Sequence, residues 1–176
     1  GAGAAVGAES NGGKWYVTTP DAVAPRRADL SEETAGEPVT TMAQLDSVVE
    51  EHGDKPALSW KATPEDEAFT SWTWAEYREQ VRQFGKSLIA VGMDRFKSVN
   101  IMGFNSREWF VADLGCIAAG GLAAGVYTSS GPDAIQYQLK HSEAVVCVVG
   151  NPALLPRFTG VGDACPELKA IVMYNT

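Results

Sequence analysis

The chain has 176 residues and is 45% hydrophobic, which is enough to build one domain with a core. Its net charge of −8 argues against general binding to nucleic acid, which depends on Lys and Arg that neutralise phosphates. The sequence contains no secretory signal and no apolar run long enough to cross a membrane. Its three cysteines and two histidines lack the spacing of a zinc site or a disulfide framework.

The first 38 residues have little to bury. Gly1–Lys14 is rich in Gly and Ala and is expected to be disordered. Lys14–Leu30 carries a Trp-Tyr pair and predicts an extended arm, for which contact with a partner or a membrane surface stays open. We therefore predict a flexible leader over residues 1–38 and a folded domain over residues 39–176.

The folded part is expected to begin with a helix and a hairpin. The helix opens at Thr41, which forms a capping box with Gln44, and it ends at Gly53. Two short strands, Pro56–Trp60 and Phe69–Thr73, are then expected to pair around a polar surface loop.

The clearest pattern is the helix that follows Thr73. Thr73 and Glu76 form a second capping box, and Gly92 marks the end of the helix. Apolar residues lie three or four positions apart along it, at Trp74, Tyr77, Val81, Phe84 and Leu88. We interpret this stripe as core packing and not as a cofactor site.

Four apolar segments alternate with helical patterns in the second half of the chain. The predicted strands are Ser98–Phe104, Leu122–Tyr127, Ala144–Val149 and Ala170–Tyr174. This alternation predicts an α/β fold with right-handed crossovers and a mostly parallel, doubly wound sheet flanked by helices. The last strand finishes almost with the chain, so we expect a domain truncated at its C-terminal end.

The helices between these strands have recognisable starts. The first is predicted to have Asn105 as its N-cap and Glu108 as its third residue. Its expected inner stripe is Trp109, Phe110, Asp113, Leu114 and Ile117. The second begins at Pro132, and a short third one begins at Asn151-Pro152. The residues of the second helix that are expected to face inward are Ala134, Ile135, Gln138 and Leu139.

No complete catalytic motif occurs in the sequence. The glycines of Gly120–Gly125 do not fit GxGxxG, and Tyr127–Pro132 lacks the second glycine and the lysine of a triphosphate loop. No G-x-S-x-G elbow supports a hydrolase triad. Glu65–Glu67 is interpreted as a solvated loop and not as a metal site. Residue patterns alone thus predict an α/β lobe without a full active site.

Three segments carry the motifs of a known family. They are Trp72–Tyr77 (WTWAEY), Gly103–Phe110 (GFNSREWF) and Ala119–Ser130 (AGGLAAGVYTSS). Together they resemble the N-terminal part of the AMP-forming acyl-CoA synthetases in the adenylating superfamily. The last two are most similar to long-chain fatty acid–CoA ligases of the bubblegum type.

The resemblance implies the N-terminal subdomain of an adenylate-forming enzyme and a reaction in two steps. A long-chain fatty acid reacts with ATP, with Mg²⁺ as the metal, to give an acyl-adenylate and pyrophosphate, and coenzyme A then displaces AMP. The family's phosphate loop and catalytic lysine match no position in this sequence, so no catalytic residue is assigned and the chain alone is expected to be inactive. The alternatives are a luciferase-like or amino-acid-activating enzyme and a non-catalytic interaction module.

The candidate cofactor-binding residues are Tyr127, Thr128 and Lys140. Tyr127 and Thr128 lie at the carboxyl end of a predicted strand, where doubly wound sheets usually meet ligands. Lys140 is a candidate to face the phosphates of coenzyme A. We expect an intracellular protein, cytoplasmic or peripheral on the endoplasmic reticulum or another membrane.

Overall fold

The structure is a computed structural model that describes residues 39–174. The chain divides into two units, residues 1–40 and 41–176, and the helices and strands of the described residues belong to the second. The predicted leader, residues 1–38, lies outside the described residues, as do Asn175 and Thr176.

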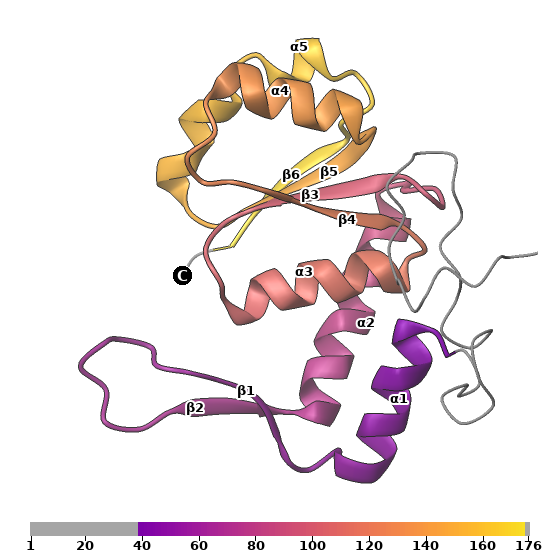
Figure 1. Ribbon diagram of the computed structural model, residues 1–176, viewed down its shortest axis with the longest axis vertical. Helices are drawn as coiled ribbons and strands as arrows, with labels where there is room; N and C mark the ends of the chain where they lie inside the picture. Colours follow the sequence, from indigo (N-terminus) through magenta and orange to yellow (C-terminus); the bar gives the residue numbers. More distant parts are fainter. Residues whose placement is uncertain (1–38, 175–176) are drawn as a thin grey trace, which may run out of the picture. The chain divides into compact units, whose positions relative to one another are not determined.

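Helices and strands alternate along the second unit (Figure 1). In chain order they are α1 (Thr41–His52), β1 (Pro56–Trp60), β2 (Thr70–Thr73), α2 (Trp74–Ala90), β3 (Ser98–Met102), α3 (Arg107–Ala118), β4 (Leu122–Val126), α4 (Pro132–His141), β5 (Ala144–Val149), the 3₁₀ helix η2 (Pro152–Phe158), α5 (Val161–Ala164) and β6 (Ala170–Met173). Among these, α5 has no counterpart in the sequence-based prediction.

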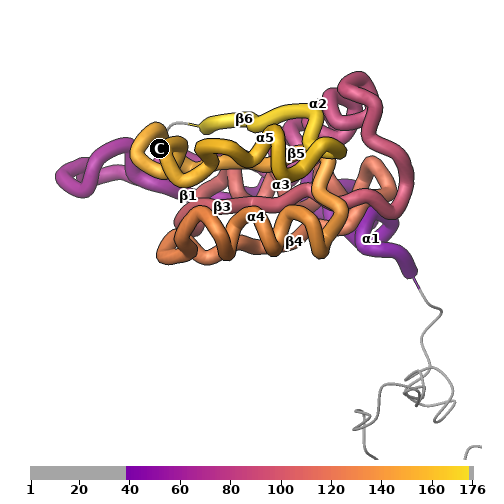
Figure 2. The backbone as a smooth tube through the Cα atoms, turned by 90° about the horizontal axis from the view of Figure 1, so that it is seen from above, coloured from indigo at the N-terminus to yellow at the C-terminus, as the bar shows by residue number. Residues whose placement is uncertain are grey.

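Four strands form the main sheet in the order β4-β3-β5-β6, and each neighbouring pair is parallel. Figure 2 shows the same order, with β6 and β4 at opposite edges. The chain leaves β3 towards one edge and then crosses to the other side of β3 through α4. This crossing makes the sheet doubly wound, so the predicted fold class is confirmed.

The sheet is covered on both faces, and each face has its own core (Figure 1). On one side Val99 and Ile101 pack with buried residues of α2 and α3. On the other side Met102 packs with Ile135 and Leu139 of α4. All six residues of β5 are buried, as expected of a strand enclosed on both faces.

The hairpin and the α2 helix match their predictions. β1 and β2 pair antiparallel, and the Thr73 side chain accepts a hydrogen bond from the backbone of Glu76. The Glu76 carboxylate in turn accepts from the Thr73 backbone at 2.8 Å, which completes the capping box. Tyr77 and Val81 of the predicted stripe are buried against α1 residues such as Leu45.

The predicted inner stripe of α3 is only partly right, since Trp109 and Leu114 pack against the cores but are half-buried. Ala112, Gly115 and Cys116 are the buried residues, whereas Phe110 is 40% exposed. The reason is that α3 lies between the sheet and α2, so it buries two opposite sides. A single stripe describes a helix with one covered face and fails for one that is enclosed. A Cβ at Gly115 would lie 2.7 Å from the Phe84 ring, so this glycine allows α2 and α3 to approach closely.

The N-cap of α3 is also one residue later than predicted. The Ser106 side chain, and not Asn105, accepts a hydrogen bond from the Trp109 backbone at 3.2 Å. Glu108 then falls at the second helical position, and its carboxylate pairs with Arg107 Nε at 2.6 Å. Asn and Ser are both good caps, so two adjacent candidates cannot be separated by residue type alone.

Two smaller predictions, for α4 and for the cysteines, have opposite outcomes. Ala134 is exposed and not inward-facing, because the inner side of α4 is narrow and is occupied by Ile135 and Leu139.

Cys116 and Cys147 are buried, as predicted, and burial raises the pKa of the Cys147 thiol to about 12. Within residues 39–174 no helix is both long enough and apolar enough to cross a membrane.

Candidate functional site

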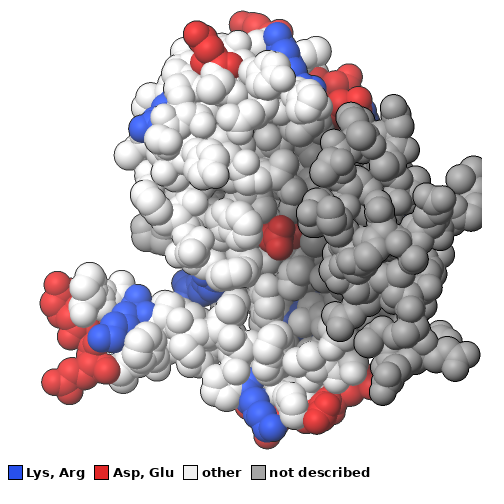
Figure 3. Space-filling view, viewed as in Figure 1, with Lys and Arg blue, Asp and Glu red and all other residues white. Residues whose placement is uncertain are grey.

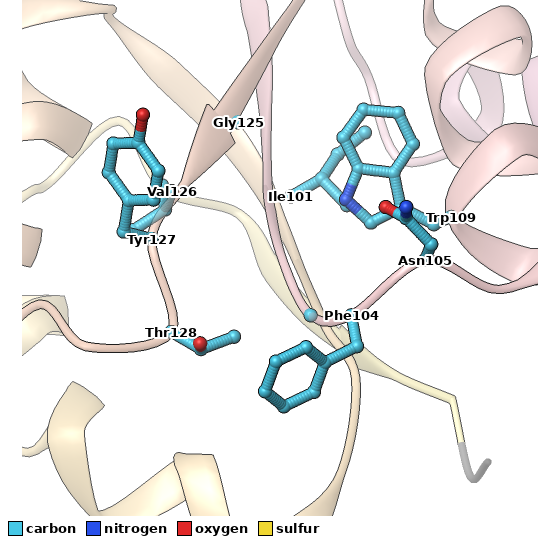
Figure 4. Close-up of a pocket in the computed structure, with 9 residues that line it drawn as sticks. Ile101, Phe104, Asn105, Trp109, Gly125, Val126, Tyr127 and Thr128 are labelled. Carbon is cyan, nitrogen blue, oxygen red and sulfur yellow. The ribbon is translucent and has the colours of Figure 1, made fainter.

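The main candidate site is a pocket of about 680 Å³ at the carboxyl ends of β3 and β4. Its lining residues are Ile101, Gly103, Phe104, Asn105, Trp109, Gly125, Val126, Tyr127 and Thr128. Figure 4 shows the Trp109 indole of α3 and the Tyr127 ring after β4 on opposite sides of the opening. The carboxyl edge of a parallel sheet is where such folds place ligands.

The chemistry of the lining is largely apolar. Side-chain polar groups are few, chiefly the Asn105 amide and the Thr128 hydroxyl, and no Lys, Arg, Asp or Glu is among the residues that line the pocket. Phe104 is 74% exposed and Tyr127 is 83% exposed at its rim. The pocket therefore suits an uncharged part of a ligand, such as a ring or a methylene chain, better than a phosphate group.

The pocket occupies the gap between the ends of β3 and β4. The corresponding gap between the ends of β3 and β5, at the same edge of the sheet, is closed. The chain crosses the sheet here, which is the point where a ligand crevice is usually found. The Gly150 backbone donates to the Met102 carbonyl at 2.8 Å, and a Cβ at Gly103 would lie 2.3 Å from the Tyr174 hydroxyl. Burial raises the pKa of Tyr174. Two glycines and a tyrosine thus fill the gap, and the opening lies one strand away, between β3 and β4.

Two of the three predicted site residues line this pocket. Tyr127 and Thr128 follow β4 in a turn that is closed by a 2.9 Å hydrogen bond from the Ser130 backbone to the Tyr127 carbonyl. The next residues lead into α4, which begins at Pro132 as predicted. The sequence placed these two side chains correctly at the end of a strand.

Lys140, the third predicted residue, lies apart from the other two. It is exposed in the last turn of α4, about 12 Å along the helix axis from Pro132. That end of the helix leads towards the amino end of β5, opposite the edge that carries the pocket. The structure therefore does not bring Lys140 and Thr128 together.

A smaller pocket, of about 380 Å³, lies where the hairpin meets the start of α3. The Arg107 guanidinium lies 4.0 Å from the centre of the Trp60 ring and 5.2 Å from that of Trp72. It also pairs with Glu108. These contacts attach the hairpin to α3, and we interpret the cluster as structural.

In the acidic loop of the hairpin, the Asp66 side chain is bound by hydrogen bonds from within the loop. The Asp66 carboxylate accepts hydrogen bonds from the Thr63 backbone at 3.0 Å and from the Thr63 hydroxyl at 2.8 Å, which lower the pKa of Asp66. Figure 3 shows acidic and basic side chains together at the tip of the hairpin, on the left of the view. No group of three or more metal-binding side chains occurs in the described part of the chain.

Sequence reasoning missed several residues around the main pocket. Sequence patterns indicate a strand end for Phe104, a cap for Asn105 and core packing for Trp109, yet these residues form the β3 side of the opening. Arg157 carries no such signal, although its Nη1 donates to the carbonyls of Thr128 and Ser130. The motif GFNSREWF marks the first group without assigning it a role, and no local pattern marks Arg157.

A doubly wound parallel sheet with a ligand-sized pocket at its carboxyl edge has the α/β architecture in which such sheets usually bind ligands. Residues 45–175 match the family described as AMP-binding enzyme. The chain belongs to this family, and the predicted resemblance to acyl-CoA synthetases of the bubblegum type is confirmed.

The relatives found by sequence are long enzymes. The chain is 35% identical over 162 residues to long-chain-fatty-acid–CoA ligase ACSBG2 of Xenopus laevis, which covers 92% of this chain and 22% of the relative. It is 35% identical over 127 residues to long-chain-fatty-acid–CoA ligase heimdall of Drosophila melanogaster, covering 72% of this chain and 19% of the relative. The chain thus spans about a fifth of the length of these relatives.

Solved structures show the same fold. The anthranilate CoA ligase AuaEII in complex with anthranoyl-AMP matches with a TM-score of 0.68 and 24% identity, over 77% of this chain and 25% of that one. The long-chain-fatty-acid-CoA ligase FadD1 from Archaeoglobus fulgidus matches with a TM-score of 0.65 and 18% identity, over 78% and 28%. The fold is therefore that of part of an adenylate-forming enzyme, as the sequence predicted.

Proposed function

We propose that this chain is the N-terminal part of a long-chain fatty acid–CoA ligase. In the reaction, a fatty acid carboxylate attacks the α-phosphate of ATP and releases pyrophosphate, and the coenzyme A thiol then displaces AMP to give acyl-CoA. The observation that carries this proposal is 35% identity over 92% of the chain to a relative named for that activity. Residues 1–38 would be a leader to the domain that starts at residue 39.

Within that enzyme, the described residues supply a scaffold and one wall of a ligand site. Tyr127 and Thr128 border the cofactor at the pocket, where they meet an uncharged part of it, because no cation lines the opening. Lys140 would reach the coenzyme's phosphates only if these extend towards the far end of α4. When bound, Mg²⁺ would neutralise the ATP phosphates. The described residues provide no group of metal ligands, so these would come from other parts of the enzyme.

The test uses the full-length protein. Purified enzyme is incubated with ATP, Mg²⁺, coenzyme A and a long-chain fatty acid, and acyl-CoA and AMP are measured. We expect equal amounts of the two products and none when the fatty acid is omitted. Pyrophosphate exchange that depends on an amino acid, and not on a fatty acid, would overturn the proposal in favour of an amino-acid-activating enzyme.

Two controls sharpen this assay. The 176-residue chain alone is expected to form no acyl-CoA, since no residue in it matches the family's phosphate loop or catalytic lysine. Flotation of the full-length enzyme with and without residues 1–38, on vesicles of neutral and of anionic lipid, tests for peripheral membrane contact. Equal binding of both forms would mean that the leader contributes nothing to such contact.

A further inference from the structure

The loop that carries Tyr127 and Thr128 accepts hydrogen bonds from an arginine side chain of a distant segment. Arg157 Nη1 donates a hydrogen bond to the Thr128 carbonyl and another to the Ser130 carbonyl, the second at 3.1 Å. The two acceptors precede Arg157 by 29 and 27 residues, so the contact joins distant parts of the chain. Both carbonyls belong to the short segment between β4 and α4.

Arg157 is itself firmly placed. It lies in the last turn of η2, next to Phe158, and both Phe158 and Leu154 are buried in the core under α4. No carboxylate of the described residues lies within ion-pair distance of its guanidinium, so these two carbonyls are the polar partners found for it there. The planar fork of a guanidinium can serve two acceptors at once, which a lysine ammonium does less well.

The loop has little else to fix its position. The Tyr127 side chain is 83% exposed and packs into no core. Gly131, the N-cap of α4, offers no side chain to close the end of the helix. Besides the turn bond from Ser130 to Tyr127 and the bond that the Ile135 backbone of α4 donates to the Gly131 carbonyl at 3.0 Å, the contacts to Arg157 are the hydrogen bonds found for residues 128–131. The position of Thr128 at the pocket therefore depends on Arg157.

We infer that Arg157 is a positioning residue that holds the Tyr127–Ser130 loop as one wall of the ligand pocket. Arg157 is not among the residues that line the pocket, so its effect on the ligand passes through the loop. The inference rests on the proposed ligase function, because it assigns the pocket to one of that reaction's three substrates. If the Tyr127–Ser130 loop shifts, the substrate that contacts it binds more weakly, and the binding of the other two substrates is unaffected.

The test compares variants of the full-length protein. Arg157→Ala removes both hydrogen bonds, and Arg157→Lys keeps the charge with a poorer fit to two carbonyls. Arg82→Ala is the matched control, because Arg82 pairs with Glu79 on the exposed side of α2. Hydrogen exchange is followed by mass spectrometry over residues 127–131, and KM and kcat are measured for fatty acid, ATP and coenzyme A.

We expect Arg157→Ala to raise exchange in the loop and to raise one of the three KM values by about tenfold, with kcat changed by less than about twofold. Arg157→Lys should lie between wild type and Arg157→Ala, and Arg82→Ala should match wild type. A purely structural role would lower the amount of active enzyme and reduce kcat equally for all substrates. That pattern, or unchanged exchange in the loop, would overturn the inference.

The two proposals fail in different ways. If the wild-type enzyme makes no acyl-CoA, the proposed function is wrong, and the exchange comparison still decides whether Arg157 holds the loop. If the wild type is active but all three KM values of Arg157→Ala equal those of wild type, the ligase stands and the positioning role is wrong. If Arg157→Ala does not fold, Arg157→Lys supplies the same comparison with a smaller change.

Discussion

The sheet has two gaps at its carboxyl edge, and they differ in what occupies them. Between β3 and β5, Gly103 and Gly150 bring two backbones together and Tyr174 covers them. Between β3 and β4, the strands end in exposed side chains around a pocket of about 680 Å³. Strand topology alone places a ligand at the first gap. The difference shows that the size of the residues at the strand ends decides which of two neighbouring gaps stays open. Glycines let two backbones meet, whereas larger side chains border an open pocket.

We expect substitutions at the closed, well-packed end of the sheet to change the stability of the fold. We expect substitutions at the open gap to change the binding of substrate. The largest contrast should come from two residues near the end of β3. Met102 is fully buried and Phe104 is 74% exposed. We expect Met102→Ala to lower the free energy of unfolding by about 3 kcal/mol, because it leaves a cavity in the core. Phe104→Ala should change it by less than about 0.5 kcal/mol.

Urea unfolding followed by circular dichroism measures both variants. Equal losses for Met102→Ala and Phe104→Ala would mean that Phe104 at the open gap is packed as tightly as a core residue. The pocket would then be filled in the folded protein, and the comparison would fail.

Two glycines give the next contrast. A Cβ at Gly150 would lie 2.9 Å from the Cα atom of Gly103, and neither backbone can move without disturbing the sheet. We expect Gly150→Ala to cost about 2 kcal/mol of unfolding free energy. Gly131, beside the open gap, has a φ of −80°, and a Cβ added there would meet no atom within 4 Å. Thermal unfolding should show that Gly131→Ala costs about 1 kcal/mol or less, because Ala is less favourable than Gly at an N-cap but meets no atom there.

Tyr127 tests the open gap by binding. Because its side chain is 83% exposed, Tyr127→Ala should leave the midpoint of thermal unfolding unchanged. It should raise KM for the substrate at the pocket by about tenfold, which corresponds to about 1.4 kcal/mol of lost binding. Tyr137→Ala, also exposed and located on α4, is the control. Identical kinetics for the two variants would remove Tyr127 from the site.

The smallest expected effect lies at the opposite edge of the sheet, outside both gaps. Glu143 accepts a hydrogen bond from Lys97 at 2.6 Å, which lowers the pKa of the Glu143 carboxyl. A lowered carboxyl pKa contributes stability above the unfolded pKa, and this contribution is lost as pH falls through the folded one. Glu143→Gln should therefore reduce the loss of stability on acidification below about pH 5.

Unfolding midpoints of Glu143→Gln and of Glu65→Gln, in the exposed hairpin loop, are compared from pH 7 to pH 3. Because the Glu143 side chain is exposed and that of Lys97 is only half-buried, high salt should weaken the effect. The same pH dependence in wild type and Glu143→Gln would show that the pair adds nothing.

Much of this fold follows from local sequence. The capping box at Thr73 and Glu76, the stripe of α2 and the apolar run of β5 each specify an element within a few residues. Gly92 and Gly120 follow the ends of helices because glycine readily adopts a positive φ, and Pro132 starts a helix because its missing N–H is not needed there. The motifs after β3 and β4 also pointed to the family and to two of the residues that line the pocket.

Tertiary structure alone decided the rest. Whether α3 buries one side or two depends on which elements pack against each side. The spacing of apolar residues along the helix does not carry this information. The closure of the gap at Gly103, and the contact of Arg157 with a loop 27 to 29 residues before it, arise only when the strands are assembled in the order β4-β3-β5-β6. Local propensity acts over a few residues, whereas a ligand site is built where distant segments meet.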